Sequence, residues 1–387
     1  MTNVRFGAVT PYFPPAELVG LAAASYEGQG YDFLLSGDQL NTTSPRSLWS
    51  PDLVPAAGMG IDIDAWMDAF QICTLAALPT SRVEIGLTCD ALRRTPVNLA
   101  QQLFTLDHIS KGRAYLCLGA GEQKQFRSYG LQRSKPFTHL EEAVRILIKF
   151  RDLEEPFDHD GPLWNLHNAH LRLGPFDRSA PPPVFVAGGP GRSIDIAAKY
   201  ADGWATYLPP AGPPEWLAAQ IAQLRSTAEQ ADRDPDRLRV MGMISSCIAN
   251  TGDAVEAAIS SPIVKWDSAC ILPSGATWRQ FGFENPLGDD FHYARDYDPA
   301  DWDRESSLRI VEQVPEAVVR GVKICGTPKE AADQILPFID AGLTDVLIGN
   351  YASLTSTGDW GDAGGEDANL TTVDLLRTAL GQKASAS

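Results

Sequence analysis

Residues 83–122, VEIGLTCDALRRTPVNLAQQLFTLDHISKGRAYLCLGAGE, decide the fold. The apolar run Val83–Thr88 predicts a buried strand, and apolar side chains at helical spacing predict a helix over Pro96–Ile109. Thr95 is the expected cap of that helix, because a proline at the next position fits the first turn. A second buried strand is expected at Ala114–Gly119. Two strands joined through a helix form the parallel βαβ unit.

The same alternation continues in both directions along the chain. Further strands are expected at Val4–Val9, Phe33–Ser36, Val184–Ala187, Trp204–Tyr207, Arg239–Ile248 and Asp345–Ile348. Further helices are expected at Pro15–Gln29, Ile63–Leu78, Phe137–Phe150, Arg192–Tyr200, Glu215–Ala231, Asp253–Ser260 and Pro328–Ala341. Eight strands, each followed by a helix, predict an α/β fold, a (β/α)₈ TIM barrel with insertions in its βα loops. A doubly wound open sheet is the main alternative, and the absence of G-x-G-x-x-G after the first strand weakens it.

Loop lengths suggest the domain organisation. We expect one barrel domain over residues 1–350, with a lid-like insertion at about 262–312 that is rich in Trp, Asp, Pro and Gly. Residues 351–387 read as a C-terminal tail with a short helix. A small hairpin is expected from the pieces Trp164–His167 and Leu171–Leu173.

Composition excludes several functional classes. The chain has 387 residues, and 32 Lys and Arg against 49 Asp and Glu give a net charge of −17. Such a surface repels phosphate backbones and anionic lipid, so we expect neither a nucleic-acid nor a membrane partner. The six cysteines include no C-x-x-C pair, and no secretory leader or 18-residue apolar run is visible, which favours a cytoplasmic protein with free thiols. No metal site is expected, because His167 and His170 would face opposite sides of a strand.

Glycine-rich segments at predicted strand ends are the candidates for a site. In Gly119-Ala120-Gly121-Glu122 the glycines allow close approach of a ligand and Glu122 is placed for acid/base work; a tight turn with a capping Glu is the alternative. Gly188–Arg192 exposes N–H groups at a helix start, which suits a phosphate, although it also fits a flexible loop without a ligand.

Two further strand ends carry charged or polar side chains. Asp38, followed by Gln39, could bond a ligand hydroxyl or cap a turn. Arg93 and Arg94 follow the strand that ends near Thr88, and they would hold an anionic tail or belong to a solvated loop.

Taken together, these segments resemble the bacterial luciferase-like superfamily of TIM-barrel oxidoreductases. The likeness rests on the opening Val-Arg-Phe-Gly strand, Gly37-Asp38, the strand ending Leu-Gly-Ala-Gly-Glu122, Ala187-Gly188-Gly189-Pro190, Ala201-Asp202-Gly203-Trp204 and Gly326-Thr327-Pro328. Within the superfamily the chain is similar to the deazaflavin-dependent branch, and particularly to the phthiodiolone ketoreductase type. That closer likeness rests on Gly37–Asn41, Arg93–Pro96, Leu166–Ala169, Ile263–Lys265 and Glu284–Phe291.

The resemblance implies coenzyme F420 as the hydride carrier, with FMN as the alternative. The ring would lie against a bulge at the end of the third strand, near Asp38, and the phosphate of the tail would bind the turn after the fifth strand. The implied cofactor contacts are Asp38, Leu87, Thr88, Cys89, Gly119, Gly121, Ala187, Gly188, Gly189, Pro190, Gly191 and Arg192. The family usually carries a proton-transferring His after the Asp, but Gln39 stands here, and an amide does not exchange a proton near neutral pH.

We therefore predict hydride transfer between F420 and a carbonyl, imine or activated alkene of a small, fairly apolar substrate. Glu122 would act as acid or base, with Asp38 and Gln39 holding the ring or the substrate. Trp49, Arg94, Lys265 and Trp266 are the expected substrate contacts, and Trp278 and Phe291 belong to the expected lid. The alternatives are an FMN-dependent monooxygenase and a barrel that binds a flavin or deazaflavin without turnover.

Two further expectations concern assembly and charge. Homodimers are common in the family, so a homodimer is expected. Because the coenzyme is anionic and the chain acidic, Arg93, Arg94, Arg192 and Lys265 should line one side of the barrel's C-terminal face.

Overall fold

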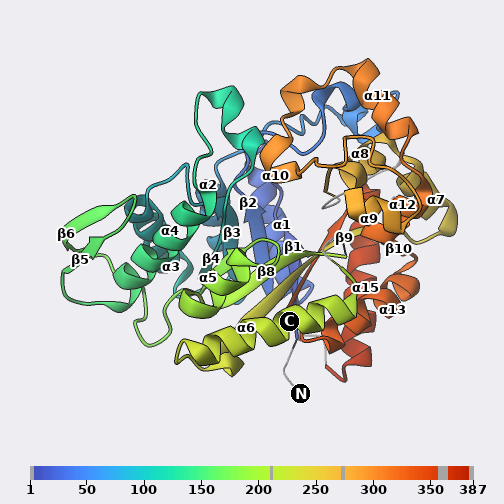
Figure 1. Ribbon diagram of the computed structural model, residues 1–387. Coiled ribbons are helices and arrows are strands. Elements are labelled where there is room, and N and C mark those ends of the chain that lie inside the picture. Colours follow the sequence, from blue (N-terminus) through green and yellow to red (C-terminus); the bar gives the residue numbers. More distant parts are fainter. Residues whose placement is uncertain (1–3, 210–211, 272–274, 356–364, 383–387) are drawn as a thin grey trace.

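A closed parallel barrel forms the body of the molecule (Figure 1). The computed structural model describes residues 4–209, 212–271, 275–355 and 365–382. Eight strands pair in the cyclic order β1, β2, β3, β4, β7, β8, β9 and β11, and β11 pairs back onto β1. Their bounds are β1 Arg5–Val9, β2 Phe33–Gly37, β3 Glu84–Asp90, β4 Ala114–Gly119, β7 Val184–Ala187, β8 Gly203–Leu208, β9 Arg239–Ile248 and β11 Asp345–Asn350. The predicted TIM barrel and all eight predicted strands are confirmed.

Helices cover the outside of the barrel. They are α1 Glu17–Gly28, α2 Ala69–Ala77, α3 Pro96–Ser110, α4 Pro136–Asp152, α5 Arg192–Tyr200, α6 Pro214–Gln230, α13 Pro328–Asp340 and α15 Gly365–Ala379. Thr95 caps α3 as expected, since its side chain accepts from the amide of Asn98. The sequence placed the start of α2 too early, at Ile63, because Asp68 caps the helix and accepts from the amides of Phe70 and Gln71.

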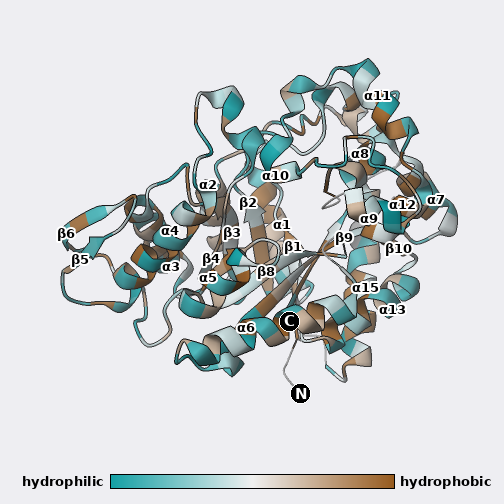
Figure 2. Ribbon diagram, viewed as in Figure 1, coloured by the Kyte–Doolittle hydropathy of each residue, from teal (hydrophilic) through white to brown (hydrophobic). Residues whose placement is uncertain are grey.

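The barrel interior is filled by rings that lie over glycines. Phe33, Tyr115 and Phe185 are buried inside the barrel with Leu35, Met241 and Leu347. The register partners of the three rings are Gly7, Gly86 and Gly203. A Cβ at Gly86 would lie 2.4 Å from the Tyr115 ring, so a side chain at this position has no room. Figure 2 shows the apolar colouring concentrated on the strands and on the inner faces of the helices.

A helical insertion between β9 and α13 has a core of its own. It comprises α7 Gly252–Ser260, α8 Pro262–Ile271, α9 Gly275–Gln280, α10 Tyr293–Asp296, α11 Arg304–Glu312, α12 Glu316–Val322 and the short strand β10 Ile324–Gly326. Trp266, Trp278 and Tyr297 are fully buried in this core. β10 pairs with the end of β9 outside the ring of eight. The segment expected as a lid is therefore mostly a packed helical layer.

The remaining elements are short. They are α14 Ala352–Thr355, the hairpin β5 Phe157–Asp160 and β6 Asn165–Ala169, and 3₁₀ turns at Arg46–Leu48, Pro55–Met59, Gln123–Gln125, Arg127–Tyr129, Pro235–Arg237 and Pro299–Asp301. The prediction of Leu171–Leu173 as the second strand of the hairpin was wrong, because β6 pairs with β5 instead. The buried Glu142 carboxylate accepts from the amides of Leu163 and Trp164 and contacts His159, and this fixes the turn so that the partner strand lies upstream.

The last helix, α15, lies in the segment that the sequence assigned to the tail. It packs against α13, and its Val373 and Leu376 are buried in the main core. Arg377 donates to the carbonyl of Gly30 at 2.5 Å. α15 therefore covers the barrel as its eighth helix. No helix within the described ranges combines the length and the apolar character that a membrane span requires.

Candidate functional site

A cavity of about 430 Å³ opens at the carboxyl ends of the barrel strands. Active sites of TIM barrels lie at this face. Its wall comes from the ends of β1, β2, β8, β9 and β11, together with Asn41–Ser44, Trp66, and Ile263 and Ile271 of α8. Most of the lining side chains are apolar, aromatic or uncharged polar groups. Among the described residues, Lys124 is the one lining side chain that carries a formal charge at neutral pH.

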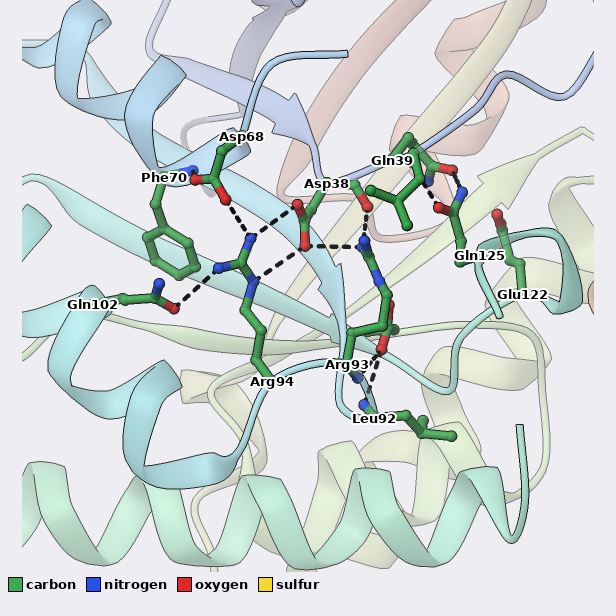
Figure 3. A network of polar contacts seen from close by, with 12 residues as sticks. Asp38, Gln39, Asp68, Phe70, Leu92, Arg93, Arg94, Gln102, Glu122 and Gln125 are labelled. Atoms are coloured by element: carbon green, nitrogen blue, oxygen red, sulfur yellow. Dashed lines mark hydrogen bonds and ion pairs between the residues drawn. The ribbon is translucent and has the colours of Figure 1, made fainter. Parts of the chain in front are cut away.

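One polar cluster is formed by Asp38, Asp68, Asp90, Arg93 and Arg94. Figure 3 shows Asp38 and Asp68 around the two arginines. Asp38 stands between Gly37 and Gln39, which both line the cavity. Asp38 pairs with Arg93 at 2.9 Å and with Arg94 at 3.1 Å, and its carboxylate side chain is only 6% exposed. Asp90 accepts from Arg93 at 2.5 Å, and Asp68 accepts from Arg94 at 2.7 Å. We call this set the Asp38 cluster.

The charges of the Asp38 cluster compensate one another. Burial alone would lower the pKa of both guanidiniums, but the carboxylates outweigh it and raise the pKa of Arg93 and of Arg94. Both arginines are bound within the protein, with side chains 10% and 19% exposed, rather than spread along the open mouth. The expected roles of Asp38 in ligand binding and of Arg94 in substrate binding stay predictions.

A second cluster, formed by Gln39, Asn41, Glu122 and Lys124, lies on the cavity wall; we call it the Lys124 cluster. The Lys124 ammonium donates to Gln39 Oε1 and, at 2.9 Å, to the carbonyl oxygen of Asn41. Glu122 Oε2 lies 3.4 Å from Lys124 Nζ and accepts from the Tyr293 hydroxyl at 3.2 Å. Gln39 and Lys124 line the cavity, whereas Glu122 is not part of its lining.

Lys124 is nearly inaccessible, with a side chain 1% exposed. Burial lowers the pKa of this lysine, and Glu122 offsets only part of the effect. Sequence reasoning missed Lys124 because a lysine in a polar turn is usually a surface residue. Its position two residues after the Gly-x-Gly-Glu motif is the one signal that could have pointed to it.

Side chains at the end of β3 point alternately into the cavity and into the core. Thr88 lines the cavity, but Leu87 and Cys89 belong to the core between barrel and helices, because alternate side chains of a strand point to opposite faces. β3 keeps an unbroken register with β4 up to Asp90 and with β2 up to Thr88, so these pairings contain no bulge of the kind that the resemblance implies. Leu87 and Cys89 could meet a cofactor only through their backbone.

The ends of β4 and β7 lie next to each other on the same face of the barrel, outside the cavity lining. Gly119 is the register partner of Ala187. Gly121 has φ of 73°, which a glycine adopts without strain. After β7, α5 begins at Arg192 without a side-chain cap, and residues 189–192 are exposed. The turn formed by Gly188, Gly189, Pro190, Gly191 and Arg192 is therefore open to a ligand, as a phosphate site requires.

The other expected substrate contacts, Trp49, Lys265 and Trp266, do not line the cavity. Trp49 donates to the carbonyl of Ile61 at 2.7 Å and packs on the insertion core. Trp266 is fully buried and donates to the carbonyl of Thr43 at 3.2 Å. α8 turns Ile263 and Ile271 toward the cavity, and neither Lys265 nor Trp266 lines it.

Among the described residues that line the cavity, three buried polar atoms have no hydrogen-bond partner: Asn41 Oδ1, Trp66 Nε1 and Asn369 Oδ1. The Trp66 ring stacks on Tyr12 with centroids 3.6 Å apart. Buried polar groups are nearly always paired in folded proteins, so two unpaired acceptors and one unpaired donor around the cavity fit a ligand with polar edges. Within the described ranges, no group of three or more His, Cys, Asp or Glu is placed to hold a metal ion.

Comparison with known proteins agrees with this architecture. The model of the luciferase-like monooxygenase family matches residues 2–345. A phthiodiolone/phenolphthiodiolone dimycocerosates ketoreductase of Mycobacterium bovis is 31% identical over 358 residues, covering 90% of this chain and 93% of the relative. An F420-dependent secondary alcohol dehydrogenase, solved with an F420-acetone adduct, has a TM-score of 0.71 at 20% identity and covers 95% of this chain and 99% of its own. A riboflavin lyase solved with modified FMN has a TM-score of 0.70 at 16% identity and covers 100% and 94%.

Proposed function

The chain belongs to the luciferase-like monooxygenase family and is an oxidoreductase, and from this premise we propose that it transfers a hydride between coenzyme F420 and a small, fairly apolar substrate. The acceptor would be a carbonyl, an imine or an activated alkene. The observation that carries the proposal is the mostly apolar cavity at the barrel mouth, with one buried cation on its wall. The relative named as a ketoreductase supports the same reaction class.

The residues present fit a deazaflavin and an apolar substrate. The unpaired Trp66 N–H and Asn41 Oδ1 would take up polar edges of the ligand, and the open Gly188–Arg192 turn would take up the phosphate of the cofactor tail. When bound, the reduced deazaflavin supplies a hydride to the substrate carbon. The chain would supply a mostly apolar site, orientation of the substrate, and a proton source.

Binding and turnover test this proposal together. We expect F420 to quench protein fluorescence with a Kd at least about tenfold below that of FMN, and reduced F420 to be oxidised when ketones or aldehydes of growing chain length are added. The proposal fails if FMN binds more tightly and F420 gives no turnover with any carbonyl compound.

A second candidate is an FMN-dependent monooxygenase, because the FMN-containing riboflavin lyase fold matches about as closely as the F420-dependent one. Reduced FMN would then drive oxygen consumption that depends on substrate. A non-catalytic binding barrel is the remaining alternative, favoured by Gln39 where the family usually carries His. It requires that Gln39→His and Glu122→Ala change no measured turnover.

We also propose a homodimer, which sedimentation at several concentrations would test.

A further inference from the structure

Lys124 is buried, belongs to the residues that line the cavity, and is held mostly by uncharged acceptors. Its side chain is 1% exposed and still lines the cavity. Two of its hydrogen bonds go to uncharged oxygens, those of Gln39 and Asn41, and the nearest carboxylate oxygen, of Glu122, is 3.4 Å away. A buried ammonium held mainly by neutral acceptors exchanges its proton more easily than one in a tight ion pair.

The charged and titratable groups around Lys124 come from three directions. Glu122 precedes it in its own turn, Cys270 approaches from α8, and Arg93 lies in the loop after β3. Tyr293 of α10 contacts the same carboxylate. Burial lowers the pKa of Lys124 most strongly; Glu122 and Cys270 act against this, and Arg93 acts with it. The balance moves the lysine toward the range in which a general acid works near neutral pH.

Other groups on the wall are poorer proton carriers. Gln39 is an amide. Burial raises the pKa of Tyr12 to about 12, and it raises the pKa of Tyr207 and Tyr351 further from neutrality. Glu122, the acid predicted from the sequence, does not line the cavity and instead faces Lys124 and Tyr293.

We propose that Lys124 is the proton carrier of the hydride transfer, a proposal that rests on the function proposed above. For a ketone, the C=O π bond breaks, the hydride and its electron pair form the new C–H bond, and the Lys124 ammonium gives a proton to the oxygen. The resulting amine regains a proton from water. In the oxidative direction the amine accepts the hydroxyl proton. Gln39 and Asn41 are positioning residues, since their oxygens hold the ammonium at the cavity wall.

The activity test compares Lys124→Met, Lys124→Arg and the exposed control Lys199→Met. We expect Lys124→Met to lower kcat for carbonyl reduction by about 100- to 1000-fold. We expect its Kd for F420 to stay within about threefold of wild type. Lys124→Arg should not restore activity, because a guanidinium keeps its proton throughout the accessible pH range. The alkaline fall of kcat in the wild type should disappear in Lys124→Met. Turnover by Lys124→Met or Lys124→Arg within about twofold of wild type overturns the proposal.

A second measurement needs neither cofactor nor turnover. Between the lowered pKa of the folded state and the ordinary lysine pKa, the unfolded chain binds more protons, so the stability of the wild type rises with pH relative to Lys124→Met. Urea midpoints at about pH 7 and about pH 10 should show this rise. A flat or falling difference overturns the proposal, and Lys124→Gln repeats the test if the Met variant does not fold.

If the wild type does not bind or turn over F420 but the pH effect is present, the proposed function has failed and the lysine assignment for that reaction falls with it. If the wild type turns over F420 and the Lys124 variants turn it over equally well, the proposed function stands and only the assignment of Lys124 has failed.

Discussion

The Asp38 cluster and the Lys124 cluster lie near each other at the barrel mouth and treat buried charge in opposite ways. In the first, three carboxylates enclose two guanidiniums, with contacts of 2.5–3.1 Å between Asp38, Asp68, Asp90 and the two arginines. In the second, one ammonium meets neutral oxygens and a single carboxylate oxygen at 3.4 Å. A fully paired cluster holds its protons tightly and serves to fix the backbone. A buried ammonium held mainly by uncharged oxygens gives up its proton more easily.

The largest effect on this contrast is expected from removing a carboxylate of the Asp38 cluster. Asp38→Ala leaves Arg93 and Arg94 buried with fewer partners, and we expect it to reduce the free energy of unfolding by about 3–5 kcal/mol. Urea unfolding followed by circular dichroism measures the change. Asp52→Ala removes a solvent-exposed pair with Arg304 and serves as the control, with no measurable loss expected.

The opposite outcome for Asp38→Ala is equally informative. A variant as stable as the wild type, with weaker F420 binding, would show that Asp38 is held for the ligand rather than for the fold. That would restore the ligand-binding role that the sequence suggests for Asp38. The Asp38 cluster could then no longer be described as a set of charges that stabilises the fold.

How far the sequence predicts these features depends on the range of the forces involved. The eight barrel strands follow from short apolar runs, and β4, β7 and β9 begin and end at the predicted residues, because burial on both faces leaves a strong local signal. The insertion was expected as a loop because Pro, Gly and Asp separate its short helices. Its stability comes from Trp266, Trp278 and Tyr297 packing over long sequence distances. β10 has three residues and follows from pairing with β9 alone.

The site was predictable as a set of strand ends but not as a set of contacts. Asp38, Gln39 and Thr88 do meet at the barrel mouth, since a parallel barrel brings all carboxyl ends together. Which side chain faces the cavity depends on strand alternation and on turns after the strands, so Leu87 and Cys89 point into the core and Lys124 points inward. The pairing of Arg93 and Arg94 with Asp38 spans 55 and 56 residues and left no local signal.

A smaller effect is expected from moving the titratable group within the Lys124 cluster. Gln39→His in the Lys124→Met background places an imidazole where the wild-type ammonium donates, so it should raise kcat about tenfold over Lys124→Met alone. The pH profile should then follow a group that titrates near pH 6.5. Steady-state reduction of a ketone across pH measures both effects. If Gln39→His adds nothing while the double variant still binds F420, the proton path does not pass this point of the wall.

The smallest effect should come from an unpaired atom rather than from a charge. Trp66→Phe keeps the stacking on Tyr12 and removes the buried Nε1–H that has no partner. Because no hydrogen bond is lost in the free protein, stability should change by less than about 1 kcal/mol, whereas ligand binding should weaken about fivefold. Trp164→Phe is the matched control: it removes another buried, unpaired indole N–H, but in the hairpin region away from the cavity, so its ligand affinity should equal that of the wild type. Equal loss of affinity in both variants would mean that the loss reflects ring size and packing. The unpaired atoms at the barrel mouth would then be no sign of a ligand, and the cavity wall would have to be understood through Lys124 alone.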